Sequence, residues 1–270
     1  MRRRTITALA LGLVGLPAIL FGGIFYFLFM GTFLVGAAWE YVRLFRIIKY
    51  EPQDVISIGG VFLIAVTRSF WPMASTPIFA ALILIALAYH TIAFERGRDL
   101  AALDFGITVG ALVYLGWIGS YLFDLRFLPE GGWWLMIVLP CVWFADTGGY
   151  SIGSAYGRHK MSPRISPKKS WEGYFAGIAS AIYGGAFLAF AYSKWGALTG
   201  DITIWQGALL GLVIGALAPL GDFGESLFKR QSGMKDSSNV FPGHGGFFDR
   251  IDSWLWAAVI GYFFIQWFIL

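Results

Sequence analysis

Apolar residues fill most of the chain in long runs, separated by short breaks that carry charge, glycine or proline. Many runs approach about 20 residues, the length that an α-helix needs to cross the hydrocarbon core of a bilayer. They are apolar on every side rather than along one stripe, which is typical of membrane-spanning helices and not of a soluble core. Nine such helices are predicted, near residues 5–21, 23–42, 55–70, 76–94, 104–123, 133–157, 171–193, 203–228 and 252–270.

The break between the first two predicted helices is the weakest. Only Pro17 and the pair Gly22 and Gly23 divide them, and membrane helices tolerate such residues, so this break can equally be a kink. The start of the chain, three arginines before an apolar run, also resembles a secretory signal. No small-residue cleavage site followed by a polar chain is present, so we expect a retained first helix.

The composition agrees with a membrane protein. The chain is 57% hydrophobic and 13% charged, whereas about a quarter of the residues in a typical soluble domain are charged. Its single cysteine, Cys141, permits no intrachain disulfide, and the modest net charge of +4 does not indicate a nucleic-acid partner. We expect an all-α polytopic protein with a single membrane domain over residues 1–270, in which residues 1–130 form a packing half and residues 131–270 a working half.

Lysine and arginine predict the orientation of the helices. With nine helices, only three of the 20 Lys and Arg residues fall on one side (Arg68, Arg126 and Lys194), and the remaining 17 fall on the other. Cytoplasmic loops carry the excess of these residues, so the amino terminus and loops 158–170 and 229–251 are expected to face the cytoplasm. We therefore expect a multi-pass protein of the plasma (inner) membrane with its active site on the cytoplasmic side.

Acidic and polar side chains gather at the end of the predicted helix 203–228. Asp222, Glu225 and Lys229 follow one another at spacings of three and four, and Ser226 lies on the same face. Two carboxylates three residues apart repel each other unless a cation or a base lies between them. An internal ion pair of Glu225 with Lys229 is one interpretation, and a site for ions or substrate is the other.

Asp249 and Asp252 repeat this spacing at the start of the last predicted helix. A carboxylate there also interacts well with the helix dipole, so one of the two can serve only as a cap. Two carboxylate pairs on adjacent helices can instead form an oxygen-rich cage that suits a hard cation such as Mg²⁺. We predict Asp222 and Asp249 as metal ligands, with Asp252 as an additional or supporting ligand. Whether one or two cations bind is left open.

A glycine-rich segment precedes the second carboxylate pair. Gly243, Gly245 and Gly246 surround His244 and follow Pro242. Such a loop lets backbone N–H groups approach a phosphate closely. Its other interpretation is a tight turn that needs positive φ angles, and both can hold together. His244 either donates to a phosphate or is structural.

The cytoplasmic loop at residues 157–173 carries the cations Arg158, Lys160, Arg164, Lys168 and Lys169. Ser170 is expected to cap the helix that follows, with Glu172 in its first turn. Lys168 and Lys169 then lie just before a helix N-terminus, which favours a triphosphate. The alternative is charge that only fixes the topology or contacts anionic lipid headgroups.

Ionisable residues also lie inside other predicted apolar helices, and three of them are Asp146, Glu40 and His90. Asp146, in the sequence FADTGGY of the sixth helix, is predicted to be a buried acid that lines the site. Glu40 and His90 have no partner that the sequence reveals, and we interpret both as structural.

The segment from Ser226 to Asp252 closely resembles the signature of the phosphatidate cytidylyltransferase (CDP-diacylglycerol synthase) family. The matching positions are Ser226, Lys229, Arg230, Lys235, Asp236, His244, Gly245, Gly246, Asp249, Arg250 and Asp252. The segments ADTGGY and SPKKSWEG are similar to the same family, so the resemblance extends to the second loop.

The resemblance implies transfer of CMP from CTP to phosphatidic acid, with Mg²⁺ held by Asp222 and Asp249. Catalytic roles are predicted for Asp222, Lys229, Asp249 and Asp252. Substrate contacts are predicted for Lys168, Lys169, Ser170, Arg230, Lys235, His244, Gly245, Gly246, Arg250 and Asp146. The lipid tails are expected to stay in the bilayer, and a homodimer is left open.

Two other functions compete with this one. A CTP-dependent lipid kinase shares the donor and the polytopic build, and its soluble product would be CDP rather than pyrophosphate. An ion transporter could use buried acids, but it would have charges strung across the membrane rather than clustered at one boundary. The Asp-Gly-x-x-Ala-Arg pattern of the CDP-alcohol phosphotransferases is absent from the sequence.

Overall fold

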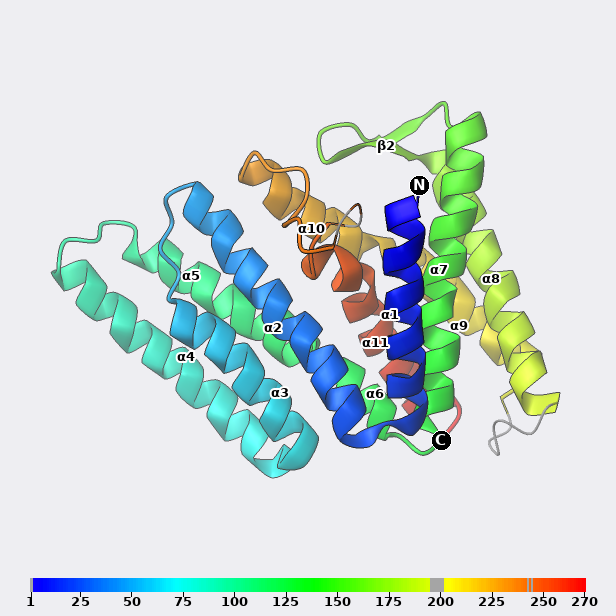
Figure 1. Ribbon diagram of the computed structural model, residues 1–270, viewed down its shortest axis with the longest axis horizontal. Coiled ribbons are helices and arrows are strands. Elements are labelled where there is room, and N and C mark those ends of the chain that lie inside the picture. Colours follow the sequence, from blue (N-terminus) through cyan, green and yellow to red (C-terminus); the bar gives the residue numbers. More distant parts are fainter. Residues whose placement is uncertain (1, 195–201, 242, 244) are drawn as a thin grey trace. The chain divides into compact units, whose positions relative to one another are not determined.

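The computed structural model describes residues 2–194, 202–241, 243 and 245–270. Most of the described residues are helical, which confirms the predicted all-α class (Figure 1). The helices are α1 (Arg2–Phe21), α2 (Gly23–Ile47), the π-helix η1 (Val55–Gly59), α3 (Gly60–Phe70), α4 (Pro72–Glu95), α5 (Ala101–Ala111), the π-helix η2 (Leu112–Ile118), α6 (Tyr121–Phe127), α7 (Gly131–Tyr156), α8 (Trp171–Lys194), α9 (Ile204–Leu217), α10 (Pro219–Gln231) and α11 (Phe248–Phe268). One short antiparallel hairpin joins α7 to α8, formed by β1 (Lys160–Ser162) and β2 (Ser166–Ser170).

Six helical stretches in the described residues are long and apolar enough to cross a membrane. They are Gly23–Ile47, Pro72–Glu95, Ala101–Phe127, Gly131–Tyr156, Trp171–Lys194 and Ile204–Gln231. The other predicted segments are helical too, but Leu11–Phe21 and Val55–Phe70 are shorter apolar helices. The protein is therefore a multi-pass helical protein, whereas the number of nine spans and the orientation of the N-terminus stay predictions.

The chain forms two compact units. The first consists of Met1–Asp124 and Phe228–Ile251, and the second of Leu125–Leu227 and Asp252–Leu270. The greater part of the segment between Ser226 and Asp252 thus folds with the N-terminal helices. The predicted packing and working halves concern function, and they stay a prediction.

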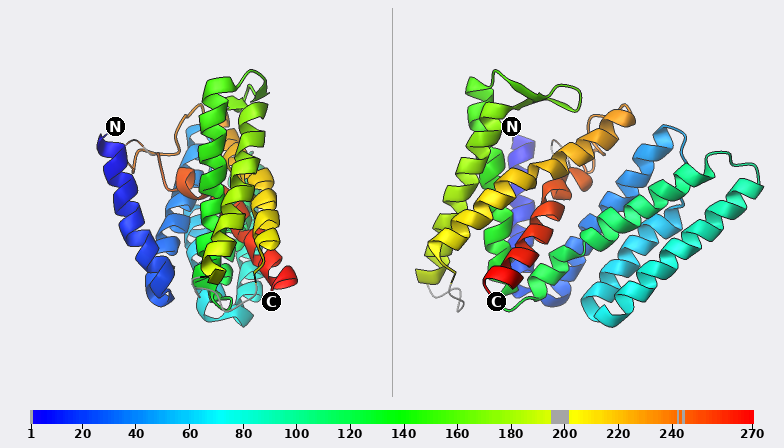
Figure 2. Two further views of the ribbon diagram at one scale, coloured as in Figure 1. Left: turned by 90° about the vertical axis from the view of Figure 1, so that its right-hand side faces the viewer. Right: turned by 180° about the vertical axis from the view of Figure 1, so that it is seen from behind.

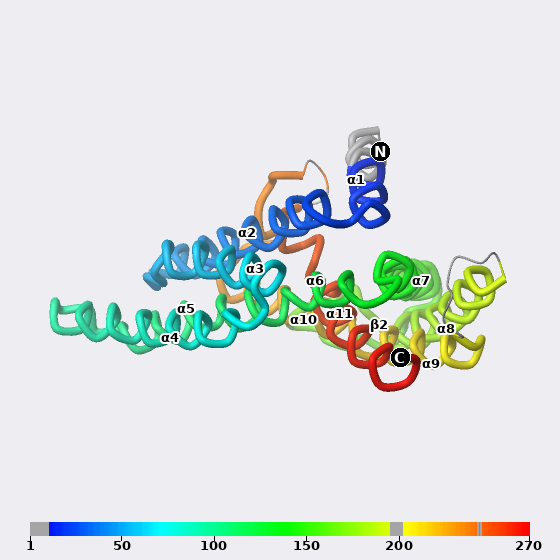
Figure 3. The backbone as a smooth tube through the Cα atoms, turned by 90° about the horizontal axis from the view of Figure 1, so that it is seen from below, coloured from blue at the N-terminus to red at the C-terminus, as the bar shows by residue number. Residues whose placement is uncertain are grey.

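In the first unit α3, α4 and α5 lie side by side, and α2 packs on α3 and α5 (Figure 3). Buried polar contacts hold the loops between these helices. Asp104, fully buried, accepts from the backbone N–H of Glu51 at 2.8 Å and from Arg98 Nε at 2.7 Å. His90, predicted to be structural, is also buried, and its Nε2 lies 3.0 Å from Thr108 Oγ1. Because these groups are buried, leaving them unpaired would be costly.

Small residues let the helices of the second unit approach closely. α7, α8 and α9 lie side by side, and the hairpin extends from the ends of α7 and α8 (Figure 2). A Cβ atom at Gly177 of α8 would lie 2.7 Å from the carbonyl oxygen of Ala145 of α7. A Cβ atom at Gly173 would lie 2.7 Å from the carbonyl oxygen of Gly149. Glycine at such positions permits the backbone contact that drives helix association in membranes.

We expect Gly177→Ala to destabilise the packing of α7 on α8. The added methyl group meets a backbone oxygen, which cannot rotate away, and overpacking of this kind typically costs about 1–3 kcal/mol. The expected result is a lower midpoint of thermal unfolding in detergent. Gly106→Ala is the matched control, because a Cβ atom at Gly106 of α5 has no neighbour within 4 Å. Equal midpoints for the two variants would contradict the packing account.

Candidate functional site

Three carboxylates of the second unit lie close together. Asp222 and Glu225 come from α10 and Asp252 from α11, and one oxygen of each lies within 4.8 Å of the others. Glu225 is buried, at 1% exposure, and Asp222 and Asp252 are half-buried. Gly221 allows the close approach of the two helices, because a Cβ atom there would overlap the carbonyl oxygen of Asp252. Carboxylates held this near one another repel unless a cation or a shared proton lies between them, and an all-oxygen donor set fits a hard cation.

Lys169 supplies one positive charge to this cluster. Strand β2 places its Nζ 2.6 Å from Asp222 Oδ2, and the same ammonium group lies 4.3 Å from the centre of the Phe223 ring. Ser226 also donates to Asp222, through Oγ to Oδ1 at 3.2 Å. The structure therefore brings Lys169 and Asp222 together, although the sequence places Lys169 in a loop and Asp222 in a helix and predicts separate roles for them.

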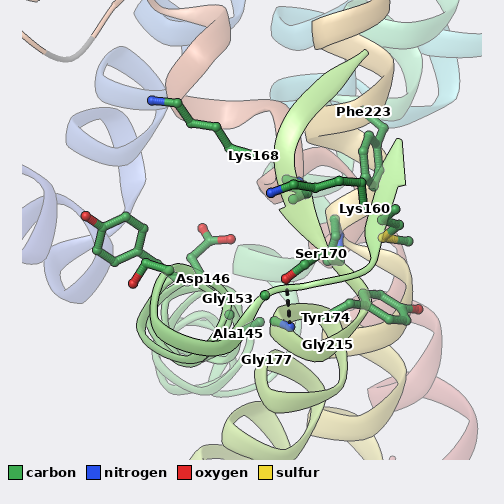
Figure 4. A pocket seen from close by; sticks show the side chains of 18 residues that line it. Ala145, Asp146, Gly153, Lys160, Lys168, Ser170, Tyr174, Gly177, Gly215 and Phe223 are labelled. Carbon is green, nitrogen blue, oxygen red and sulfur yellow. Dashed lines mark hydrogen bonds between the residues drawn. The ribbon is translucent and has the colours of Figure 1, made fainter. Parts of the chain in front are cut away.

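A cavity of about 600 Å³ adjoins Lys169 (Figure 4). It is bounded by α7, the hairpin, α8, the end of α9 and the start of α10, and its volume is within the range of small-ligand pockets. Glycines form much of its wall, and cations of the hairpin lie at its edge. The lining includes Asp146, Gly149, Gly153, Lys160, Lys168, Lys169, Ser170, Gly173, Gly177, Gly215 and Phe223.

The structure corrects the expected burial of Asp146. Its side chain lines the cavity, as Figure 4 shows, but it is exposed rather than buried. Asp146 follows the middle of α7, where the helix leaves the packed core and borders the cavity. Lys160 lines the cavity as well, although the sequence gives no specific role to this cation of the loop.

The expected cap of α8 is confirmed. The backbone N–H of Gly173 donates to Ser170 Oγ at 3.2 Å, so Ser170 satisfies one free donor of the first turn. Glu172 accepts from the backbone N–H of His159 at 3.1 Å, and its Oε1 lies 2.6 Å from His159 Nδ1. These contacts hold the hairpin on the start of α8, and with it the two lysines of β2.

In the first unit, Asp249 is surrounded by donors. Its Oδ1 accepts from Lys229 Nζ at 2.6 Å, and its Oδ2 accepts from Ser237 N at 3.0 Å and Gly246 N at 2.8 Å. Ser237 Oγ lies 2.6 Å from the same Oδ2 and shares its one proton between Asp249 and Glu40. Burial by itself would raise the pKa of the Asp249 carboxyl. The charge of Lys229 and the hydrogen bonds from Gly246, Lys229 and Ser237 outweigh it and hold the pKa at about 2. Asp249 is therefore an ionised, fully hydrogen-bonded carboxylate.

This arrangement bears on the predicted metal ligands. Among the described residues, the carboxylates grouped closely enough to hold an ion are Asp222, Glu225 and Asp252, and Asp249 is not one of them. For Asp249 to bind a metal, it would have to exchange a hydrogen bond for the ion. Its role as a ligand stays a prediction, and Glu225 joins the candidates.

Glu40, interpreted from the sequence as structural, has partners that the sequence does not reveal. It lies on α2, is fully buried, and accepts hydrogen bonds from Ser237 Oγ at 2.7 Å, from Ser238 Oγ, and from the N–H groups of Phe247 at 2.9 Å and Phe248 at 2.8 Å. The one signal in the sequence was an acid inside an apolar helix, which marks a functional residue by default. Its partners lie about two hundred residues away, so no local pattern could identify them.

The glycine-rich segment forms the tight turn that one interpretation predicted. Gly243 and Gly245 have φ angles of 80° and 79°, and Phe241 N donates to Gly245 O at 2.9 Å. The N–H of Gly246 binds Asp249, so this donor serves the protein's own carboxylate. His244 lies outside the described residues. Of the cations in this segment that are predicted to contact substrate, Arg230 and Lys235 are exposed and Arg250 is half-buried. Lys229, predicted to be catalytic, is buried.

Comparison with known proteins gives long matches. The family model described as "Cytidylyltransferase family" matches residues 2–268. A phosphatidate cytidylyltransferase of Pseudomonas aeruginosa is 36% identical over 282 residues, which cover 96% of this chain and 94% of that protein. The protein of the same name from Haemophilus influenzae is 31% identical over 298 residues, with 100% of both chains covered. That of Staphylococcus aureus (strain COL) is 32% identical over 261 residues, which cover 94% of this chain and 95% of the relative.

Proposed function

Because the chain belongs to the cytidylyltransferase family, we propose that it is an enzyme that transfers the CMP group of CTP to phosphatidic acid, giving CDP-diacylglycerol and pyrophosphate. One structural observation carries the proposal: three clustered carboxylates and Lys169 stand beside a cavity edged with further cations. This is the combination that a reaction between two phosphate anions requires.

The chemistry follows from the charges of the reactants. An oxygen of the phosphatidic acid phosphate attacks the α-phosphorus of CTP, the bond from that phosphorus to the bridging oxygen breaks, and pyrophosphate leaves. The attacking oxygen is already anionic, so no strong general base is needed. The barrier lies in bringing the negative groups together, and Lys160, Lys168 and Lys169 can offset that charge in the cavity.

Mg²⁺ is the cofactor that we propose. Asp222, Glu225 and Asp252 would hold it, because carboxylate oxygens suit this ion and the three residues are near enough to share it. When bound, the ion supplies positive charge to the phosphates and orients them. Lys169 Nζ lies 2.6 Å from Asp222 Oδ2, so this ammonium group is placed to bind a substrate phosphate beside the metal site.

The lipid substrate fits the apolar build of the protein. Six described helices are long and apolar enough to span a bilayer, so the acyl chains can stay in the membrane while the headgroup reaches the polar site. We propose the plasma membrane as the location and the cytoplasm, where CTP is available, as the side that the cavity faces. The excess of lysine and arginine on loops 158–170 and 229–251 supports this orientation.

The experiment that tests the proposal is product analysis. The purified protein in detergent, given CTP, phosphatidic acid and Mg²⁺, should form CDP-diacylglycerol and pyrophosphate in equal amounts, both identified by mass spectrometry. Formation of CDP with a newly phosphorylated lipid would instead show a lipid kinase. The names of the relatives do not support that alternative, nor an ion transporter.

We expect Lys169→Gln to raise the KM for CTP and to lower kcat. The variant loses the ammonium group that lies beside Asp222 and that we propose to bind a phosphate of CTP. A hydrogen bond to a charged group such as this phosphate is worth about 1.5–3 kcal/mol. Since each 1.4 kcal/mol is about tenfold, kcat/KM for CTP should fall about 10- to 100-fold. Arg164→Gln removes an exposed cation of the hairpin turn and should leave kcat/KM within about twofold, as surface substitutions usually do. Normal kinetics for Lys169→Gln would remove this lysine from the site.

A further inference from the structure

Glu40 is a carboxylate that the transfer chemistry leaves unused. It is at 0% exposure on α2, in the first unit. A buried carboxylate is costly unless hydrogen bonds replace the water that it loses. Here four donors do so, and all four belong to the segment between residues 237 and 248.

The four donors come from both ends of that segment. Ser237 and Ser238 stand at its start, and Phe247 and Phe248 at its end, where α11 begins. Glu40 Oε1 binds Ser238 Oγ and Phe247 N, and Oε2 binds Ser237 Oγ and Phe248 N. Each carboxylate oxygen thus joins the start of the segment to its end. One side chain of α2 closes the loop that we call the 237–248 loop.

The face of α2 that carries Glu40 fits this loop closely. Phe33 and Gly36 precede Glu40 by seven and four residues and share its face. The ring of Phe33 is stacked on that of Phe241, with 5.8 Å between centroids, and meets that of Phe247 at 5.5 Å. A Cβ atom at Gly36 would overlap the ring of Phe247. Phe33, Gly36 and Glu40, which follow one another along one face of α2, all contact or make room for this loop.

Glu40 also reaches Asp249 through Ser237. The hydroxyl of Ser237 lies 2.7 Å from Glu40 Oε2 and 2.6 Å from Asp249 Oδ2. Asp249 accepts in turn from Gly246 N and from Lys229, whose side chain is only 8% exposed. A shift of the loop would therefore move the donors that hold Asp249 against Lys229.

We propose that Glu40 is a positioning residue for CMP transfer: by fastening both ends of the 237–248 loop, it fixes the Lys229–Asp249 pair in its working geometry. The role in transfer rests on the proposed function, whereas the hold on the loop does not. The N-terminal helices then supply more than packing, because α2 organises the segment with the greatest density of charge.

Glu40→Gln tests the inference. The amide keeps the size of the side chain but has a single acceptor oxygen, so in either orientation an NH₂ group faces one serine and one backbone N–H. We expect hydrogen exchange over residues 237–248 to become faster while exchange over α4 stays unchanged. We also expect kcat to fall by about 100-fold, the loss that a displacement of about 1 Å can cause. Glu95→Gln, which changes an exposed glutamate of α4 in the same unit, is the matched control and should alter neither quantity.

The two serines provide a second route if Glu40→Gln fails to fold. Ser238 binds Glu40 and Val240 N, whereas Ser237 binds both Glu40 and Asp249. Ser237→Ala should therefore lower kcat more than Ser238→Ala, and both should speed exchange over the loop. Unchanged exchange in the folded variants overturns the inference, and so does faster exchange with normal kcat. If the wild-type protein shows no transfer, the proposed function fails, but the exchange experiment still decides whether Glu40 holds the loop.

Discussion

Replacing Asp222 by Asn should abolish CMP transfer, with kcat at least about a thousandfold below that of the wild type. Asp222 belongs to the three-carboxylate cluster, pairs with Lys169 at 2.6 Å and accepts from Ser226. The substitution removes one negative charge from the proposed metal site and leaves the ammonium group of Lys169 without its partner. A metal ion contributes several kcal/mol to stabilising charge in such a transition state, and each 1.4 kcal/mol is about tenfold in rate.

The measurement is turnover of the purified Asp222→Asn variant over a range of Mg²⁺ concentrations. Asp99→Asn is the control, because Asp99 is an exposed aspartate far from the cluster in sequence and lies in the other compact unit. High Mg²⁺ should not restore the Asp222 variant. Near-native turnover in a folded preparation would show that Asp222 binds no catalytic metal.

Asp249→Asn should lower both the stability and the activity of the protein, because it breaks a buried ion pair. Lys229 and Asp249 form an ion pair at 2.6 Å with side chains only 8% and 10% exposed. Removing one charge leaves the other buried and uncompensated, which typically costs about 3–5 kcal/mol. We expect a large fall in the midpoint of thermal unfolding, a matching loss of turnover, and an unchanged apparent affinity for Mg²⁺ in the activity that remains.

Lys229→Met and the double variant complete this test. If the two residues act as a pair, the second substitution should lower the free energy of unfolding much less than the first, because the charge it removes has already lost its partner. If the losses of unfolding free energy of the two single variants add up in the double variant, Lys229 and Asp249 act independently. A marked fall in apparent Mg²⁺ affinity for Asp249→Asn alone would show that Asp249 is a metal ligand, as the sequence predicts.

The positions of the helices could be predicted because their signal is local. A run of apolar residues and its charged ends define a segment directly, and the predicted helix 171–193 corresponds to Trp171–Lys194 in the structure. The predicted helix 203–228 contains a break that hydropathy alone does not show. α9 ends at Leu217 and α10 begins at Pro219, a residue that suits the first turn of a helix and cannot donate within one.

The hairpin between α7 and α8 escaped prediction for a physical reason. Its strands are only three and five residues long, and their polar sequences KMS and SPKKS lack the alternation that marks a strand. Without that alternation, the sequence predicts only a loop between the two helices. The hairpin form matters because it carries Lys169 to Asp222.

The sequence predicts those residues of the candidate site that belong to a recognisable local motif. Asp222, Asp252, Lys169 and Ser170 all stand in motifs of unusual residue types, and the structure places each in the second unit's site or at its edge. Glu40 could not be assigned, because its partners depend on how α2 packs against a segment far along the chain. The spacing of apolar residues shows which face of a helix is buried, but it does not show which hydrogen-bond donors will pack against that face.

The most direct test of the account uses CTP carrying different labels on its α- and γ-phosphates. After incubation with phosphatidic acid, Mg²⁺ and the purified protein, the lipid and water phases are separated and both labels are counted. We predict the α-label in the lipid, the γ-label in the water as pyrophosphate, and neither transfer nor release once EDTA removes the metal. The γ-label in the lipid, with the α-label left in water as CDP, would contradict the account, as would the absence of both labels from the lipid.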